Sequence, residues 1–270
     1  MRIKIDFCDF WPGFDKANNY FYNLLKEDYE IEISNNPDYL FFSVFGNNHQ
    51  NYKCVKIFYT GENVPPPTYC DWSFSFEPTW GNNFRLPHYL LYDGYYELVN
   101  KKVDESLLNR KFCNFVASNP NCPTRNKFVE ELSKYKKVDS GGRWMNNIGY
   151  VVGDKRKFQS EYKFSVAFEN EAYRPNYEWY VTEKIMEPMT VNSIPIYKGG
   201  SKVCDDFNKK SFVNYHDFNN MKDFIGYIVY LDKNDDKYLF VLKTNWFDKN
   251  IIPYKKGEVK KFFQNIINLS

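Results

Sequence analysis

The chain has 270 residues, 43% of them hydrophobic, and its 36 basic and 34 acidic side chains leave a formal net charge of only +2. This weak charge, without a long basic tract, argues against a nucleic-acid partner. No apolar run approaches the roughly 20 residues of a membrane-spanning helix. The six cysteines include no Cys-x-x-Cys pair of the kind that binds zinc.

These bounds predict a globular chain of one large or two small domains. Polar residues interrupt the apolar pattern at the N-terminus, so no signal peptide is visible. We therefore expect a cytoplasmic protein without an integral membrane segment, in which the cysteines are reduced.

The first part of the chain alternates short strand patterns with one helical pattern. A strand is predicted at the N-terminus, where Ile3, Ile5 and Phe7 alternate with polar residues. Apolar residues at helical spacing predict a helix over 17–26, and further strands are predicted over 30–34, 39–44, 54–59 and 70–76. This order is typical of an α/β domain with a mostly parallel sheet.

A carboxylate follows the predicted strand 54–59. Glu62 stands between Gly61 and a run of three prolines, which places its side chain at the end of a sheet strand. That position is well placed for chemistry, but a loop glutamate that hydrogen-bonds the turn backbone would show the same pattern. His88, farther on, is a candidate sugar ligand, although a histidine among aromatic residues is more often structural.

The second part of the chain begins after a charged connection, residues 95–110. A strand is predicted over 111–118, and Thr124 is the predicted N-cap of a helix with Arg125 in its first turn. Because the helix dipole disfavours a cation there, Arg125 is either an ordinary exposed residue or a functional one. Gly141 and Gly142 in the next loop permit either a close approach of nucleotide or backbone, or a tight turn.

A strand–loop–helix–strand segment over 164–200 dominates this second part. The strand 164–168 leads into a polar loop, Thr182 is the predicted N-cap of a helix, and the strand 193–197 ends at two glycines. In open α/β sheets, ligands bind beyond the carboxyl ends of the strands. The polar side chains concentrated at that end are Asn170, Tyr180, Glu183 and Lys184. The alternative for the last two is a solvated pair in a first helical turn.

Helical patterns fill the C-terminal region. Apolar residues at helical spacing predict helices over 221–231, from 238 onward, and over 259–269.

Several motifs carry a family resemblance. Phe-x-Phe-Glu-Asn, Tyr-Val-Thr-Glu-Lys-Ile and Ile-Pro-Ile-Tyr-x-Gly-Gly, in this order, resemble the donor-binding motif of the α-1,3/α-1,4-fucosyltransferases of glycosyltransferase family 10. The stretches around Glu62, Arg125 and Gly141 are similar to other blocks of the family. The resemblance implies a GT-B-like fold, with two Rossmann-like α/β domains facing across a cleft. An acceptor-side domain is then expected over 1–107 and a GDP-fucose-binding domain over 108–270, with the last helix packing back on the first domain.

The resemblance also implies a reaction. It is the inverting transfer of L-fucose from GDP-β-L-fucose to a glycan hydroxyl, expected to be the 3-OH of GlcNAc or Glc. Glu62 would act as general base, and Arg125 and Lys184 would offset charge on the leaving GDP. Glu183 would bind the sugar hydroxyls or offset an oxocarbenium-like charge. Asn170 and the tyrosine at position 180 would hold the nucleotide-sugar.

Other features bear on partners and alternatives. We expect no metal and no cofactor besides the donor GDP-fucose, and an oligosaccharide or glycoconjugate as acceptor. Asp205-Asp206 falls where the family has loop and helix rather than a metal site. Lys198 replaces a common tryptophan, and the loop 171–179 is longer than usual. The membrane anchor and stem of animal relatives are not seen, which favours a soluble enzyme of bacterial or viral type. A transferase using another nucleotide sugar and a catalytically silent glycan-binding protein remain alternatives.

Overall fold

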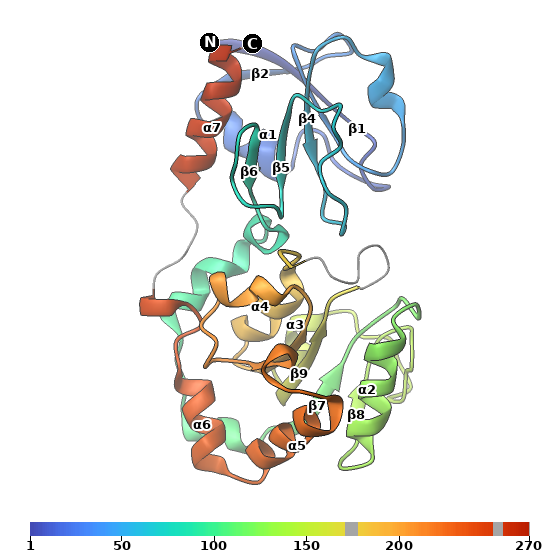
Figure 1. Cartoon of the computed structure of the whole chain (residues 1–270), viewed down its shortest axis with the longest axis vertical. Helices are drawn as coiled ribbons and strands as arrows, with labels where there is room; N and C mark the ends of the chain where they lie inside the picture. Colours follow the sequence, from blue (N-terminus) through green and yellow to red (C-terminus); the bar gives the residue numbers. More distant parts are fainter. Residues whose placement is uncertain (171–177, 251–255, 270) are drawn as a thin grey trace. The chain divides into compact units, whose positions relative to one another are not determined.

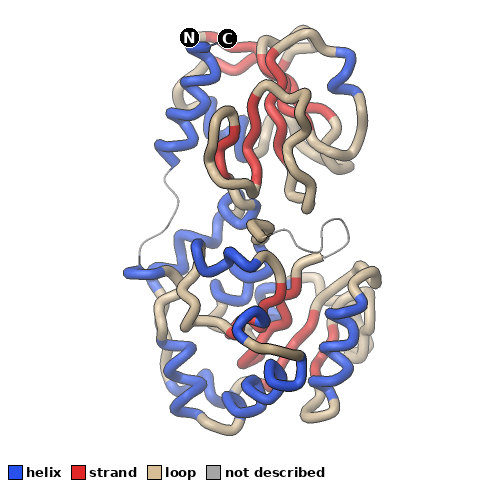
Figure 2. The backbone as a smooth tube through the Cα atoms, viewed as in Figure 1, coloured by secondary structure: helices blue, strands red, loops and turns tan. Residues whose placement is uncertain are grey.

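The computed structural model describes residues 1–170, 178–250 and 256–269, which group into two compact units (Figures 1 and 2). Unit 1 holds 1–91 together with 254–270, and unit 2 holds 92–253. The domain boundary at 107/108 stays a prediction, and the loop 171–177 with Pro175 lies outside the described residues.

Unit 1 is built on a six-stranded sheet in which every neighbouring pair is parallel. The order is β2-β1-β3-β4-β5-β6. The strands are β1 (Arg2–Cys8), β2 (Glu30–Ile33), β3 (Tyr39–Phe42), β4 (Val55–Tyr59), β5 (Trp72–Ser75) and β6 (Asn83–Arg85), and the helices are α1 (Tyr20–Leu25) and α7 (Lys256–Leu269).

Aromatic side chains fill the core of unit 1. The ring of Phe41 on β3 stacks on Phe7, on Phe21 of α1 and on Phe263 of α7, with centroid distances of 5.1, 4.9 and 6.0 Å. Such pairs contribute about 0.5–1.5 kcal/mol each beyond the area they bury. The helix at the end of the chain therefore belongs to the core that the first strands form.

Unit 2 repeats the parallel arrangement with five strands, in the order β11-β10-β9-β7-β8. The strands are β7 (Lys111–Phe115), β8 (Val138–Ser140), β9 (Tyr162–Phe168), β10 (Ile194–Lys198) and β11 (Val213–Asn214). The helices are α2 (Pro123–Ser133), α3 (Lys155–Gln159), α4 (Glu183–Thr190), α5 (Met221–Asp232) and α6 (Asp235–Lys243).

Short 3-10 turns link these elements in both units. They are η1 (Asn48–Asn51), η2 (His88–Leu91), η3 (Asp93–Asn100), η4 (Glu105–Asn109), η5 (Ser201–Asp205), η6 (Tyr215–Asp217) and η7 (Asp248–Asn250). The predicted charged connection 95–110 thus overlaps η3 and contains η4.

The two sheets share one topology. In each unit the first strand lies between the second and the third, so the strand order reverses between β1 and β3, and again between β7 and β9. Ligands of open α/β sheets bind at the carboxyl ends of the strands at such a switch point. Each unit therefore has one place where the backbone favours a binding site.

Most predicted elements of the core are confirmed, and some details are wrong. The parallel β9–α4–β10 unit and its N-cap Thr182 are confirmed. Helix α2 starts at Pro123 with Cys122 as its N-cap, rather than at Thr124, because proline is well suited to the first helical position. Strands β6, β8 and β11 were not predicted, since two or three residues are too few to show a period.

Candidate active site

A pocket of about 260 Å³ lies at the switch point of unit 2. The ends of β7 and β9 supply two of its walls, and α2, α3 and α4 each contribute one cationic side chain. It is lined by Phe115, Val116, Ala117, Ser118, Asn119, Arg125, Lys155, Val166, Phe168, Asn170 and Lys184. Three of the predicted donor-binding residues, from three separate segments, thus meet in one cavity.

Arg125 is held firmly in this pocket. Its residue is 3% exposed, and its guanidinium donates hydrogen bonds to the backbone oxygen of Asn119 and, at 3.2 Å, to Oδ1 of Asn170. The guanidinium also lies 5.6 Å from the ring centroid of Phe115. The structure therefore excludes the reading of Arg125 as an ordinary exposed residue, and it favours a fixed donor for an anion.

Glu169 organises the neighbouring wall, although no role was predicted for it. The residue is 2% exposed, and its carboxylate accepts hydrogen bonds from the backbone N–H and the hydroxyl of Thr182 at 2.7–2.9 Å. The Lys184 ammonium lies 3.3 Å from Oε2 of the same carboxylate. One buried carboxylate at the end of β9 thus fixes both the start of α4 and the cation that follows it.

Lys184 remains charged in this setting. Its side chain is 22% exposed, and Glu183 adds a second carboxylate 3.5 Å from its ammonium. Burial opposes the charge, but Glu169 and Glu183 outweigh it and raise the pKa of Lys184 above its ordinary value. The pair 183–184 is therefore not a solvated surface pair.

Two predicted donor-side residues, Glu183 and Tyr180, are not among the described residues that line this pocket, and one cation was missed. Tyr180 is 4% exposed and does not line this pocket, within the part of the chain that the structure describes. Lys155 of α3 does line it, with its ammonium bonded to Glu187 of α4. A lysine in a charged stretch gives no sequence signal of its own, because only the fold brings it to the pocket.

Two glycines explain how these segments approach so closely. A Cβ at Gly142 would lie 2.0 Å from the backbone oxygen of Ala117, which lines the pocket. A Cβ at Gly199 would lie 2.4 Å from Cγ of Glu169. The glycine pair after α2 therefore serves the approach of backbone to backbone, one of the alternatives predicted for it.

The predicted base, Glu62, lies in unit 1 in the loop after β4. The hydroxyl of Thr60 accepts a hydrogen bond from the Glu62 backbone N–H at 3.1 Å, and the Glu62 carbonyl accepts one from Val64 at 2.7 Å. The half-buried carboxylate itself has no hydrogen bond or ion pair with any residue in the described ranges. The backbone thus makes the turn, and the side chain is available for chemistry.

His88 packs against the loop that carries Glu62. Its Nδ1 lies 2.6 Å from the hydroxyl of Tyr59, and a Cβ at Gly61 would come within 3.0 Å of the imidazole. These contacts fit the structural role that the sequence favoured, since the imidazole packs against the glycine that precedes Glu62.

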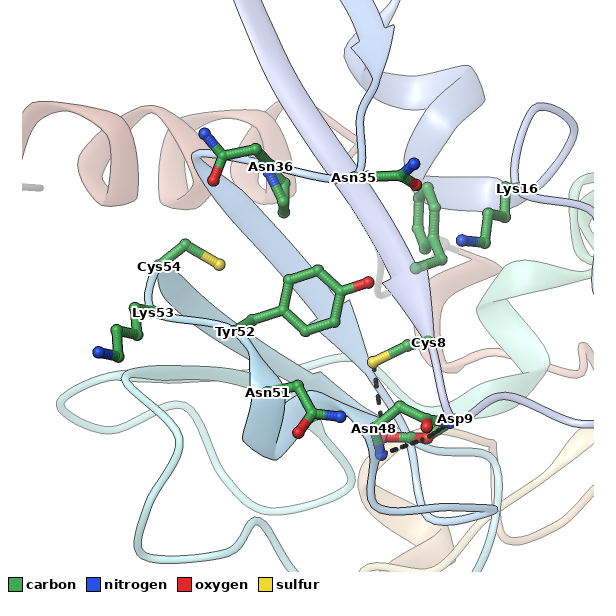
Figure 3. Close-up of a pocket in the computed structure, with 12 residues that line it drawn as sticks. Cys8, Asp9, Lys16, Asn35, Asn36, Asn48, Asn51, Tyr52, Lys53 and Cys54 are labelled. Carbon is green, nitrogen blue, oxygen red and sulfur yellow. Dashed lines mark hydrogen bonds between the residues drawn. The ribbon is translucent and has the colours of Figure 1, made fainter.

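A second pocket, of about 780 Å³, borders the switch point of unit 1 (Figure 3). The Asp9 carboxylate at its edge accepts hydrogen bonds from the backbone and side chain of Asn48 and from the backbone of His49, and it lies 2.7 Å from Nδ1 of the His49 ring. Two of the lining residues, Lys16 and Tyr52, donate hydrogen bonds to the carboxylate of Asp6, at 2.6 and 3.2 Å. The carboxylates of Asp9 and Asp6 are thus occupied by donors from the protein itself.

Metal and membrane signals are weak in the described ranges. No cluster of three or more His, Cys, Asp or Glu there has the arrangement of a metal site. No helix of these ranges is both long and apolar enough to cross a membrane.

Two family models match the chain. The model for the "Alpha-(1,3)-fucosyltransferase FucT N-terminal domain" matches residues 5–92. The model for "Glycosyltransferase family 10 (fucosyltransferase) C-term" matches residues 107–261, which is more than half of the chain. These matches confirm the resemblance that the motifs predicted.

Two known proteins resemble the chain, one along nearly all of its length and one along less than half of it. It is 35% identical over 321 residues to the alpha-(1,3)-fucosyltransferase FucT of Helicobacter pylori, a match that covers 98% of this chain and 66% of that protein. It is also 35% identical over 128 residues to the GDP-fucose protein O-fucosyltransferase 3 of Xenopus laevis, covering 43% of this chain and 26% of that protein. The chain thus spans about two thirds of the first relative's length and about a quarter of the second's.

A solved structure resembles it as well. A crystal structure of an α1,3-fucosyltransferase with GDP-fucose matches with a TM-score of 0.83 and 30% identity, covering 98% of this chain and 90% of that chain. This match confirms the predicted fold class, a GT-B-like chain of two parallel α/β domains.

Proposed function

Because the chain belongs to glycosyltransferase family 10, we propose that it transfers L-fucose from GDP-β-L-fucose to a hydroxyl group of a glycan acceptor. The observation that carries the proposal is the pocket at the switch point of unit 2, where Arg125 is buried and Lys184 is paired with a buried carboxylate. A similar α1,3-fucosyltransferase crystallises with GDP-fucose, which supports the same donor here.

The cations suit a nucleoside diphosphate as leaving group. As the bond between the fucose anomeric carbon and the β-phosphate oxygen breaks, negative charge develops on that phosphate. Fixed positive groups aimed at a developing anion are often the largest catalytic contribution, worth about 3–4 kcal/mol for a single donor. We assign this role to Arg125 and Lys184, and we assign to Asn170 and Glu183 the binding of the nucleotide-sugar.

Glu62 supplies the other half of the reaction in this proposal. Its carboxylate takes the proton from the acceptor hydroxyl, and the oxygen attacks the anomeric carbon on the face opposite GDP. The β-linked donor therefore gives an α-linked product, and no covalent enzyme intermediate forms. The free carboxylate in a rigid loop supports this role.

The acceptor is the less defined part of the proposal. The relatives that match include one named for α-1,3 transfer and one named for protein O-fucosylation. We propose an oligosaccharide acceptor, fucosylated at the 3-OH of GlcNAc or Glc, because the match to the first relative covers nearly the whole chain.

The test is release of GDP from GDP-fucose over a panel of acceptors that includes N-acetyllactosamine, lactose and simple monosaccharides. Release that requires one acceptor is the expected result. Equal release without any acceptor would reduce the reaction to donor hydrolysis. If GDP-fucose does not bind while another nucleotide sugar does, the donor assignment is wrong.

A further inference from the structure

A third pocket, of about 500 Å³, lies on unit 1 and has no part in the reaction described above. It lies between the end of the Glu62 loop and the turn that joins β5 to β6. The lining residues are Pro66, Cys70, Asp71, Trp72, Ser73, Glu77, Pro78, Trp80, Asn82 and Asn83.

The wall of this pocket carries an unusually exposed aromatic ring. Trp80 is 86% exposed, far more than the other tryptophans that the structure describes as exposed. The turn that carries it is closed by two hydrogen bonds of 3.0 Å between the backbones of Trp80 and Asn83, with Gly81 at φ +55° between them. The hydrogen-bonded turn therefore exposes the indole to solvent. A large exposed apolar ring is typical of a surface that binds a ligand or a partner.

The polar side of the pocket has two different parts. The side-chain oxygen of Asn83 is already used within the protein, because Oδ1 accepts hydrogen bonds from Ser73 and Ser75 at 2.8 and 2.7 Å. The Glu77 carboxylate makes no side-chain bond with any residue in the described ranges. Asp71 adds a second carboxylate to the lining, so the pocket repels phosphates, nucleotides and other anions.

An open indole face beside a free carboxylate fits one neutral ligand class well. A sugar ring has an apolar C–H face that can cover an indole, and hydroxyl groups at its edge that can donate to a carboxylate. Pro66 and Pro78 add apolar surface without adding charge. This combination favours a neutral saccharide over a phosphorylated ligand.

The pocket is also connected to the predicted base through the chain. Pro66 follows Glu62 by four residues, a stretch that spans at most about 14 Å when fully extended. The run 65–67 is all proline, which restricts the backbone of this link. A ligand beside Trp80 is therefore within the reach of one short oligosaccharide from Glu62.

We propose that the pocket beside Trp80 is a subsite for the acceptor, which binds a sugar unit of a neutral oligosaccharide next to the unit that receives fucose. The proposal rests on the proposed function for the position of the reacting sugar, but not for the binding itself. Trp80 stacks on the sugar ring, and Glu77 accepts hydrogen bonds from its hydroxyl groups. Acceptors longer than a disaccharide then bind more tightly than short ones.

The first test is quenching of tryptophan fluorescence by iodide in the full chain, with no GDP-fucose present. A neutral tetrasaccharide that ends in N-acetyllactosamine is expected to protect part of the accessible fluorescence. The Trp80→Ala variant is expected to lose both that accessible part and its protection. Trp144→Ala, which removes a 37% exposed tryptophan from unit 2, serves as the matched control and is expected to keep the protection.

The second test compares KM values for the tetrasaccharide and for N-acetyllactosamine. Trp80→Ala is expected to raise KM for the tetrasaccharide about tenfold, which corresponds to about 1.4 kcal/mol, and to change kcat and the disaccharide KM little. Glu77→Gln is expected to raise the tetrasaccharide KM by a smaller factor in the same direction.

The outcomes separate this subsite from the proposed function. Protection without any GDP release keeps the subsite and overturns the transferase assignment. GDP release with equal KM ratios in the parent chain and in Trp80→Ala overturns the subsite alone. Protection by a proline-rich peptide, and not by the saccharide, would also overturn it, because the pocket would then serve a protein partner.

Discussion

The two units share a strand order but use their switch points in opposite ways. In unit 2 the point between β7 and β9 opens into a pocket that receives Arg125, Lys155 and Lys184. In unit 1 the same point, between β1 and β3, holds a carboxylate whose oxygens are occupied by protein donors. The topology therefore sets where a site can form, and the loop residues decide whether a ligand can use it.

The backbone around the switch point of unit 1 holds the Asp9 carboxylate in place. Asp9 adopts φ 58°, a conformation that costs about 1–3 kcal/mol for a residue other than glycine. A Cβ at Gly46 would lie 2.4 Å from the Asp9 carboxylate, so only glycine leaves room for it. The Glu62 carboxylate, which has no bond with any described residue, lies two strands away along the sheet, in the loop after β4.

Replacing the Glu62 carboxylate of unit 1 is expected to have the largest effect on transfer. In Glu62→Gln the acceptor hydroxyl loses its proton acceptor, so kcat is expected to fall about 10²–10⁴-fold. GDP binding, measured by titration calorimetry, is expected to stay unchanged because the proposed GDP site lies in unit 2. Near-normal turnover in this variant would remove Glu62 from the mechanism.

Removing a cation from the open switch point is expected to have the next largest effect. Lys184→Ala eliminates a fixed charge from the pocket, so kcat/KM is expected to fall about 10²–10³-fold, with weaker GDP binding. Lys157→Ala, an exposed lysine on α3, is the matched control. Equal GDP affinity in Lys184→Ala and the parent chain would show that the ammonium does not contact the diphosphate.

Replacing the buried carboxylate beside that cation is expected to change the pH dependence. The raised pKa keeps Lys184 charged well into the alkaline range, and the contribution is lost only as pH rises through that value. In Glu169→Gln the burial of Lys184 is no longer offset by the Glu169 carboxylate, so the pKa of Lys184 falls. Glu183 and Tyr180 still favour the charged form. GDP affinity is then expected to fall at a lower pH, by about tenfold for each unit of pKa lost at high pH.

The pH dependence of GDP affinity separates an effect on the charge of Lys184 from a folding defect. Titration of GDP between pH 7 and 10 is the measurement, since a purely structural defect would lower affinity equally at every pH. Glu187→Gln, which changes the carboxylate bonded to Lys155, is the matched control. Parallel pH curves for Glu169→Gln and the parent chain would contradict the proposed link between Glu169 and Lys184.

Replacing the closed carboxylate of unit 1 is expected to have the smallest effect on the donor. Although burial opposes it, hydrogen bonds from His49 and Asn48 hold the pKa of Asp9 below its ordinary value of 3.8. This stabilisation is present above pH 3.8 and is lost as pH falls through the lower, folded value. Asp9→Asn is expected to lower the free energy of unfolding by about 1.5–3 kcal/mol at neutral pH and to leave GDP affinity unchanged.

The check is denaturant unfolding of Asp9→Asn at pH 7 and pH 3, beside GDP titration at pH 7. The stability difference is expected to shrink at the lower pH. A loss of GDP binding in a variant that is still folded would mean that the two switch points are not separate in function.

Local patterns were enough to predict much of the fold. The alternation of apolar residues marked β1, and the capping residue Thr182 marked the start of α4. Arg125 and Lys184 stand out as candidates because they lie within ordered motifs, and their roles stay predictions. These features depend on neighbours a few residues apart, which a sequence displays directly.

Other features depend on residues that are far apart. Asp9 meets His49 across 40 positions, so neither residue shows in the sequence that the unit 1 switch point is closed. Glu169 could have been noticed, because a carboxylate that ends an apolar strand needs a partner when buried. Lys155 and Trp80 gain their positions only from the fold, since a charged stretch and a single aromatic residue carry no local pattern.

A crystal structure of this chain with GDP would test the contrast between the two switch points most directly. We expect the diphosphate oxygens to lie within hydrogen-bond distance of the Arg125 guanidinium and the Lys184 ammonium, at the carboxyl ends of β7 and β9. GDP bound in the pocket of Figure 3, or bound to unit 2 without contact to either cation, would contradict this account.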